Sequence, residues 1–433
     1  MPSGLRRRFP IGIGTVVMVL IAAMVASVGL VLAQAPDPPQ GRGYGFGQLR
    51  DYADRPDTAW TRGIDDLPGF SSSGGPVTVA DTHGSTWLLA YPSGLGRAFL
   101  AVNRFDGTSR WDKPIVAGLG SCAFDSGAHV GCAVKVGDVP DGFYLVDPGS
   151  GALGPPQPLE DTGRMIGAGK DFIRVNQVGY RVSATSPGGT TTWSRTFADS
   201  ATPAYLPEAD LVDVKLADAS HILLDPHTGA TRLSCTTCTV TAYPTGLAVS
   251  QAGDSGVVDF YAFSAGKLVT KPTHTSRSMQ VSAGPATLAV VGGTGLATVS
   301  ETHGRFEIRD PAKPKGLWSV ADDSLSKGRP MACGRLVAFG RKDATRVVMR
   351  LDGKGTVVGH LPAPDRQRPD TSIAELRCVG SFGDLLVVAN DNQITAFDTA
   401  AGRIRWEVPV NGTAQNVDGH LVLRQGATIS LLR

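Results

Sequence analysis

From about residue 60 onward, apolar and polar positions alternate in one recurring unit. An apolar, β-branched run leads to Asp or Ser, then to a short turn rich in Gly, Pro and Thr, and then to a second run that often contains Trp. Asp and Ser bond back to the backbone of their own turn, and Gly supplies a positive φ. The unit recurs every 39–46 residues when it is aligned on Asp106, Asp147, Ser186, Asp225, Ser264, Asp310, Asp352 and Asp398. A period of about 40 residues made of strands and turns predicts the blades of a β-propeller.

Each unit has room for four strands. In the last full unit they are expected at 374–380, 384–390, 393–398 and 403–409, and the third unit reads the same way over 163–197. Outside the N-terminal 33 residues, no stretch sustains a helical period of 3.6 residues. The sequence therefore predicts an all-β propeller built from four-stranded antiparallel blades.

The two ends of the repeat region predict how the ring closes. The fragment 59–63 carries Trp60 in the way that the outer strands of other units carry a Trp, and the tail supplies strand-like runs at 420–425 and 428–433. Joining them into one composite blade removes the open edges. Eight turn motifs and a composite blade would make nine. We take one unit to merge with a neighbour, or the tail to complete the first unit, and predict eight blades.

The N-terminus reads as a membrane anchor. Ile11 to Ala33 form a run of 23 residues without a charge, which as a helix spans roughly 34 Å, enough to cross a hydrocarbon core of about 30 Å. Arg6 to Arg8 precede it, so residues 1–10 are expected in the cytoplasm and the rest outside. The alternative is a cleaved signal peptide, because Ala33-Gln34-Ala35 has the small-x-small form. The length of the run and Pro36 directly after such a cut favour an uncleaved, single-pass anchor in the cell membrane.

Residues 34–57 mix Pro, Gly and charges without apolar periodicity, which predicts an extended or disordered linker before a propeller of residues 58–433. The run Gly43-x-Gly45-x-Gly47 neither follows a strand nor opens a helix, so it fails the structural test for a phosphate-binding loop.

Charge excludes one class of partner. Lys and Arg total 41 and Asp and Glu 39, and three arginines precede the anchor, so the rest of the chain has 41 − 3 = 38 basic against 39 acidic residues. Such a body has no overall attraction for nucleic acid. We expect no nucleic-acid partner.

An exported domain with six cysteines favours disulfides. Cys122 and Cys132 flank a turn and are expected to pair across a hairpin, with a Cα separation of about 5–6 Å. Cys235 and Cys238 have the spacing of a redox or zinc half-site, but a four-cysteine zinc site needs a second close pair, so a small structural loop is favoured. Cys333 and Cys378 remain as partners by elimination and would have to bridge consecutive blades.

The turn with its trailing tryptophan resembles a known repeat. Residues 105–111 (FDGTSRW) and 397–406 (FDTAAGRIRW) are similar to the D-x-x-T-G-x-x-x-W repeat of pyrroloquinoline-quinone-type propellers, and 225–229 (DPHTG) is a partial match. The resemblance implies that Trp111, Trp193, Trp318 and Trp406 dock between neighbouring blades. That family includes quinoprotein dehydrogenases and the propeller lipoprotein of the outer-membrane β-barrel assembly machinery.

Catalytic patterns are weak. The family's dehydrogenases place adjacent cysteines against the cofactor and use carboxylates to hold calcium, but this chain has no Cys-Cys pair and no D-x-[DN]-x-[DN]-G loop. Its eight histidines are scattered, and it contains no G-x-S-x-G elbow, H-E-x-x-H pair or phosphate loop. The sequence favours a non-enzymatic binding or scaffolding module of a bacterial envelope, without a cofactor, that contacts envelope proteins or wall polymers. The alternative is a dehydrogenase that holds the quinone and calcium in its central channel.

Overall fold

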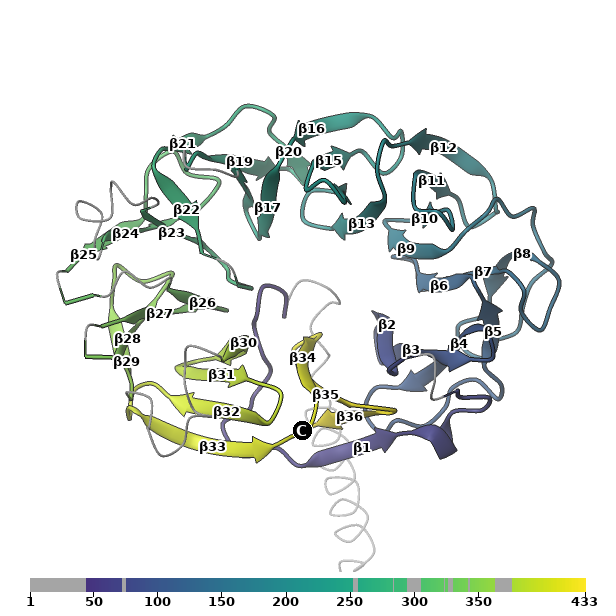
Figure 1. Cartoon of the computed structure of the whole chain (residues 1–433), viewed down its shortest axis with the longest axis horizontal. Helices are drawn as coiled ribbons and strands as arrows, with labels where there is room; N and C mark the ends of the chain where they lie inside the picture. The colour runs from purple at the N-terminus through teal and green to yellow at the C-terminus, as the bar shows by residue number, and fades with distance from the viewer. Residues whose placement is uncertain are drawn as a thin grey trace, which may run out of the picture. The chain divides into compact units, whose positions relative to one another are not determined.

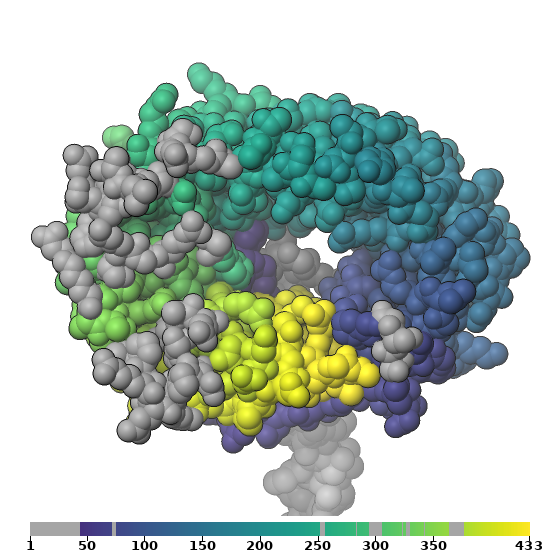
Figure 2. All heavy atoms as spheres, viewed as in Figure 1, coloured from purple at the N-terminus to yellow at the C-terminus, as the bar shows by residue number. Residues whose placement is uncertain are grey.

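The computed structural model describes residues 44–71, 75–251, 256–282, 284–293, 305–322, 324–325, 330–341, 343–362 and 376–433. These residues form nine antiparallel sheets around a central opening, a β-propeller (Figures 1 and 2). No helix within these ranges is long and apolar enough to cross a membrane. The cytoplasmic segment 1–10, the anchor 11–33 and residues 34–43 of the linker, all predicted from sequence, lie outside the described residues.

The strands follow the expected repeat, with four per blade in most blades. Blade 1 contains β1 (Thr58–Arg62), β34 (Thr413–Val417), β35 (His420–Gln425) and β36 (Thr428–Leu432), and blade 2 contains β2 (Thr78–His83), β3 (Thr86–Ser93), β4 (Gly96–Asn103) and β5 (Ile115–Gly118). Blade 3 contains β6 (Ser121–Phe124), β7 (Val130–Val134) and β8 (Gly142–Val146), and blade 4 contains β9 (Arg164–Ala168), β10 (Asp171–Val175), β11 (Arg181–Thr185) and β12 (Thr191–Thr196). Blade 5 contains β13 (Ala201–Leu206), β14 (Leu211–Leu216), β15 (His221–Leu224) and β16 (Thr231–Cys235). Blade 6 contains β17 (Cys238–Tyr243), β18 (Gly246–Gln251), β19 (Val258–Ser264), β20 (Lys267–Leu268) and β21 (His274–Ser276), and blade 7 contains β22 (Met279–Val281), β23 (Ala289–Gly293), β24 (Arg305–Arg309) and β25 (Trp318–Ala321). Blade 8 contains β26 (Met331–Cys333), β27 (Leu336–Gly340), β28 (Arg346–Arg350) and β29 (Val357–Leu361), and blade 9 contains β30 (Arg377–Phe382), β31 (Leu385–Ala389), β32 (Gln393–Asp398) and β33 (Arg403–Pro409). A 3-10 turn, η1 (Ile64–Asp66), follows β1.

The antiparallel order gives the ring two distinct faces. In blades 2 to 9 the first strand along the chain lies nearest the opening and the last lies at the rim, whereas in blade 1 β34 is innermost and β1 outermost (Figure 1). Strands are counted here outward from the opening. Turns between first and second strands and between third and fourth strands therefore lie on one face, which we call the motif face. Turns between second and third strands, and the crossovers from one blade to the next, lie on the opposite crossover face.

The prediction of eight blades is wrong by one. Each of the eight turn motifs connects the third strand of a separate blade to the position of its fourth strand, from Asp106 after β4 to Asp398 after β32, and the composite sheet of β1, β36, β35 and β34 makes the ninth. No unit merges with a neighbour. In blade 3 residues 152–157 replace a regular fourth strand, bonding to β8 through Phe143–Gln157 and Val146–Leu153 bridges.

The composite blade closes the ring as the sequence indicated. β1 pairs antiparallel with β36, with Trp60 opposite Leu431. Residues 44–57, expected to be linker, are extended but packed against the sheets, and we call them the strap. The strap runs along the inner turns of blades 7, 8, 9 and 1 on the motif face, where Leu49 N–H donates to Ser381 O at 2.9 Å and Arg50 N–H donates to Gly419 O at 3.0 Å. A Cβ on Gly47 would lie 2.4 Å from Pro285 O, so this position needs glycine.

Tryptophans join consecutive blades around the rim. The indole N–H of Trp111 donates to Pro148 O at 3.1 Å, that of Trp193 to Pro226 O at 2.7 Å and that of Trp318 to Leu351 O at 3.0 Å, each in the motif turn of the next blade. Trp60 repeats the contact with Arg104 O at 2.9 Å. The glycine of the next motif turn lies against the indole, as Gly151 does on Trp111 and Gly229 on Trp193. This packing explains why the repeat combines glycine with tryptophan.

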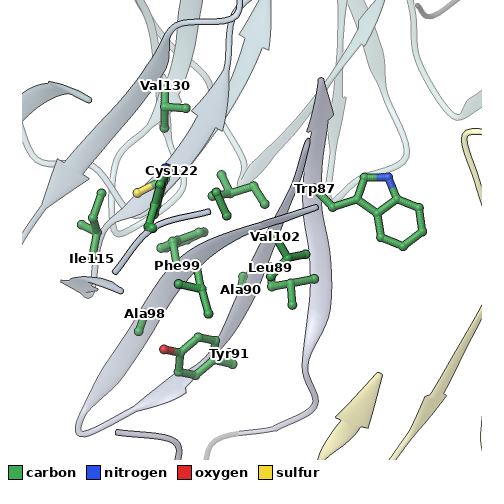
Figure 3. Packing of buried hydrophobic residues seen from close by; sticks show 14 of the residues in the cluster. Trp87, Leu89, Ala90, Tyr91, Ala98, Phe99, Val102, Ile115, Cys122 and Val130 are labelled. Carbon is green, nitrogen blue, oxygen red and sulfur yellow. The ribbon is translucent and has the colours of Figure 1, made fainter. Parts of the chain in front are cut away.

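The core is distributed among the blades. Its largest cluster fills the space within and between blades 1, 2 and 3, where Trp87, Phe99, Ile115, Cys122 and Val130 are buried (Figure 3). Both faces of each middle strand pack against neighbouring sheets, which is why β3 and β4 contain almost unbroken apolar runs.

All three expected cysteine pairs are disulfides. Cys122 and Cys132 lie directly opposite one another in β6 and β7, with a Cα separation of 4.2 Å, shorter than expected. Cys235 ends β16 and Cys238 begins β17, so their bond brackets the crossover from blade 5 to blade 6. Cys333 of β26 and Cys378 of β30 join the innermost strands of blades 8 and 9, with a Cα separation of 5.6 Å.

Candidate binding surface

The crossover face of blades 2 to 4 carries a row of exposed apolar side chains at turn tips. Leu95 lies in the β3–β4 turn, Leu119 in the crossover before β6, Val136 after β7, and Val178 and Tyr180 in the β10–β11 turn. Their exposed fractions are 93%, 44%, 63%, 64% and 43%. Single exposed apolar residues are ordinary, but a contiguous group indicates a contact surface. We call these five residues the apolar platform.

Close backbone contacts hold the tips together. A Cβ on Gly96, next to Leu95, would lie 2.1 Å from Gly118 O, and one on Gly118 would lie 2.3 Å from Val136 O. The N–H of Leu119 donates to Lys135 O at 2.8 Å. Larger residues at the two glycines would force the turns apart. The platform is therefore continuous across blades 2 and 3.

A side chain extends the continuity to blade 4. The amide of Gln177, next to Val178, donates to Leu119 O and to Thr162 O, both at 2.9 Å. Arg97 in β4 donates to Gly163 O, in the crossover before β9, at 3.4 Å. The side chains of Gln177 and Arg97 both bond here to main-chain atoms, so they fix the positions of the turns.

Val136 has a backbone conformation that valine rarely adopts. Its φ is +57°, in the left-handed region that favours glycine. The carboxylate of Asp141 holds it there, accepting the N–H of Val136 at 2.8 Å and the ammonium of Lys135 at 2.6 Å. That ion pair lowers the pKa of Asp141 and raises the pKa of Lys135. A strained, exposed β-branched residue is a feature of functional sites more than of ordinary turns.

A cavity of about 330 Å³ lies between blades 2 and 3 at the rim. It is apolar inside, where Ile115, Val116, Val139 and Leu153 line it, and Lys113 and Asp138 stand among its polar residues. Val139 and Asp138 belong to the same loop as Val136, between β7 and β8. The cavity meets the loop of Val136 only through Asp138 and Val139, because the rest of its lining, residues 112–116 and 150–153, belongs to the motif turns of blades 2 and 3 and to the residues that follow them.

The motif face has a different character, with titratable groups between blades. Burial raises the pKa of Asp81 in β2 to about 6, although the N–H groups of Phe124 and Thr82 donate to it and favour its charged form. Among the described residues no three His, Cys, Asp or Glu side chains are grouped so that they could hold a metal ion.

Blades 4 and 5 are joined on this face by His227. Its ring nitrogens lie 3.3 Å from Asp171 Oδ2 and 3.1 Å from Asp210 Oδ2. Burial alone would lower the pKa of His227, but the hydrogen bonds to Asp210 and Asp171 outweigh that effect and raise it. His227 belongs to the DPHTG turn motif, and the structure gives it the role of an inter-blade contact.

The tryptophans and cysteines that the sequence analysis named are not part of the platform, although some of them lie in the same blades. Trp111, Trp193, Trp318 and Trp406 lie between blades on the rim, and the cysteines are in disulfides. The platform has its own signal in the sequence, because four of its tips are an apolar residue followed by glycine: Leu95-Gly96, Leu119-Gly120, Val136-Gly137 and Val178-Gly179.

No protein-family model matches the chain, and no curated protein matches it. Among solved structures, BamB from Moraxella catarrhalis is 14% identical over 88% of this chain and 98% of that one, with a TM-score of 0.46. The computationally designed Ika8 protein is 14% identical over 84% and 97%, with a TM-score of 0.42. Sqt1 from Chaetomium thermophilum, solved with the N-terminus of the ribosomal protein L10, is 16% identical over 73% and 98%, with a TM-score of 0.38. The resemblance to the pyrroloquinoline-quinone-type repeat family stays a prediction.

Proposed function

We propose that this chain is a non-enzymatic binding or scaffolding propeller of a bacterial cell envelope, held to the cytoplasmic membrane by residues 11–33 with its N-terminus inside. The observation that supports binding is the apolar platform. Its tips are exposed, contiguous and fixed by main-chain contacts, so an incoming surface would meet them already in place and little conformational entropy would be lost.

The chemistry of the platform favours a protein partner. Leu95, Val136 and Val178 offer apolar contact without a concentrated charge. Nucleic acid would need a basic surface, which the near-neutral body does not supply. Envelope proteins are the proposed partners, with wall polymers as the second class.

Variants of the full chain in its own membranes test the binding role. After mild crosslinking, the wild type is affinity-purified beside Leu95→Asp and a matched control, Val357→Asp, whose residue is 49% exposed on the outer strand of blade 8. A carboxylate at position 95 would be desolvated on binding. We expect the wild type and Val357→Asp to recover the same proteins and Leu95→Asp to recover at least tenfold less of one of them. Equal recovery by all three chains would contradict the proposal.

The anchor is tested separately. Protein extracted from membranes should retain Arg6 to Arg8 when its N-terminal peptide is identified by mass spectrometry. Recovery instead of a soluble form that begins at Pro36 would contradict the membrane anchor while leaving the binding role of the propeller open to the variant test.

A further inference from the structure

We propose that the apolar platform binds a second copy of this chain, so that two propellers associate through the crossover faces of their blades 2 to 4. The proposal rests on the proposed binding function and names its partner. It is carried by the charges that surround the platform, considered together with the apolar tips.

The rim of the platform carries both signs of charge. Arg97 and Arg164 are exposed on one strand end each, and Asp138 and Asp161 are exposed in the adjoining loops. None of the four forms an ion pair with another described residue, although Arg97 and Asp161 each make a hydrogen bond, Arg97 to Gly163 O and Asp161 from Gln177 N–H. Two guanidinium groups and two carboxylates thus surround the apolar tips without ion pairs to other described residues, although the charge of Asp161 also acts on Lys135 and raises its pKa.

Such a rim is complementary to itself. In a two-fold contact every residue of the surface faces another residue of the same surface, so a rim of one sign would repel its own copy. A rim with both signs can place Arg97 or Arg164 of one copy opposite Asp138 or Asp161 of the other. A partner with a strongly acidic or basic surface would instead meet like charges on part of this rim.

The rest of the molecule does not oppose association. Its 38 basic and 39 acidic residues after the N-terminal arginines leave almost no net charge, so two copies do not repel one another at long range. The strap runs on the motif face, which leaves the crossover face clear of it.

Leu95 is the most exposed tip of the platform. It lies in the two-residue turn between β3 and β4, with 93% of its surface exposed. A two-fold contact would use Leu95 twice, once from each copy. Loss of this one side chain therefore affects the contact twice.

Sedimentation of the full chain in detergent tests the proposal. We expect wild type and Val357→Asp to sediment with a protein mass of two chains that falls toward one chain on dilution. Leu95→Asp should require at least a tenfold higher concentration to reach the same two-chain fraction. A one-chain mass for the wild type at every concentration would overturn the proposal. So would a two-chain mass that Leu95→Asp leaves unchanged, which would indicate association through the anchor.

A crosslink within the membrane provides a second measurement. A cysteine at the tip, Val136→Cys, is treated with a short bismaleimide, with Val357→Cys as the control, after peptide mapping has verified the three native disulfides. A product of two identical chains for Val136→Cys alone supports the proposal. A product with a different protein overturns it, while leaving the proposed binding function intact. If the Leu95→Asp purification and both measurements here show no dependence on the platform, the proposed function fails as well.

Discussion

Trp406 and Tyr52 meet at the point where the two ends of the propeller join. The indole N–H of Trp406 donates to Tyr52 O at 2.9 Å, across a separation of 354 residues. In blades 1, 2, 4 and 7 the rim tryptophan bonds to the motif turn of the next blade. Blade 1 has no such turn, because its third and fourth positions, β36 and β1, come from opposite ends of the propeller. The strap therefore supplies the carbonyl that the composite blade lacks.

Tyr52 also links the strap to the last two strands. Its hydroxyl donates to Leu432 O and accepts the N–H of Leu421, both at 2.8 Å, and burial raises its pKa to about 12. Tyr52→Phe leaves both main-chain groups buried without that partner, at a cost of about 1–3 kcal/mol. Urea unfolding should show this loss, whereas Tyr180→Phe, at an exposed position, should change the free energy of unfolding by less than about 0.5 kcal/mol. Equal stability of the two variants would contradict the role of the strap.

The glycine beneath each tryptophan has a steric role that a matched pair of variants isolates. Gly229 has φ +67°, and an added Cβ would lie 2.7 Å from Trp193 Cδ2, whereas Gly426 has φ +53° and open space around it. Gly229→Ala and Gly426→Ala both place alanine in the left-handed region. Only the first also overpacks, so it should lose at least about 1 kcal/mol more in urea unfolding. A smaller loss at Gly229 than at Gly426 would contradict this packing.

The sequence predicted the blades better than it predicted their ends. The turn motifs identified every third strand of blades 2 to 9 because Asp, Ser and Gly have fixed roles in those turns. β34 was missed because its five residues, Thr413 to Val417, are only partly buried beside the opening and give no apolar run. The strap was missed because Leu49 and Tyr52 are single buried residues in a segment otherwise rich in Pro, Gly and charges.

The platform shows why a site of this kind is hard to find from sequence. Its tips are 24, 17 and 42 residues apart along the chain, from Leu95 to Leu119 to Val136 to Val178. Only the stacking of blades 2 to 4 brings them onto one face. The repeated apolar–glycine pair is visible in the sequence, but nothing in the local pattern indicates which face each turn occupies.

Acid should destabilise the propeller through His420. Burial, together with the nearby Arg50, Arg104 and Arg433, lowers the pKa of His420 from 6.5 to about 3. Below pH 6.5 the imidazole of His420 binds a proton in the unfolded chain, whereas in the folded chain it stays neutral until the pH falls to about 3. The contribution of neutral His420 to the free energy of unfolding is therefore complete above pH 6.5. It is lost as the pH falls to about 3, by at most about 1.4 kcal/mol per pH unit.

Urea unfolding of the wild type and His420→Leu between pH 7 and pH 4 measures this effect. The difference in unfolding free energy between the two chains should shift in favour of the variant as the pH falls. His420→Gln serves as a second non-titrating variant with a polar side chain. Parallel pH profiles for all three chains would contradict the lowered pKa.

Val136 allows stability and binding to be separated. Replacing it by glycine removes the strain of a β-branched residue at positive φ, so Val136→Gly should keep or raise the free energy of unfolding, by up to about 1 kcal/mol. The same change removes an apolar tip and should reduce recovery of the partner in the affinity purification. A variant that is destabilised by more than about 1 kcal/mol, or that binds as well as the wild type, would contradict the assignment of Val136 to the platform.

Photo-crosslinking from within the platform tests the binding claim most directly. A photoreactive phenylalanine derivative is placed at Leu95 of the full chain in its own membranes, with the same residue at Val357 as the control. Irradiation should produce a discrete protein adduct from position 95 and none of the same mass from position 357, with the mass of two chains if the partner is a second copy. No adduct from position 95, or the same adduct from both positions, would contradict a binding role for this face.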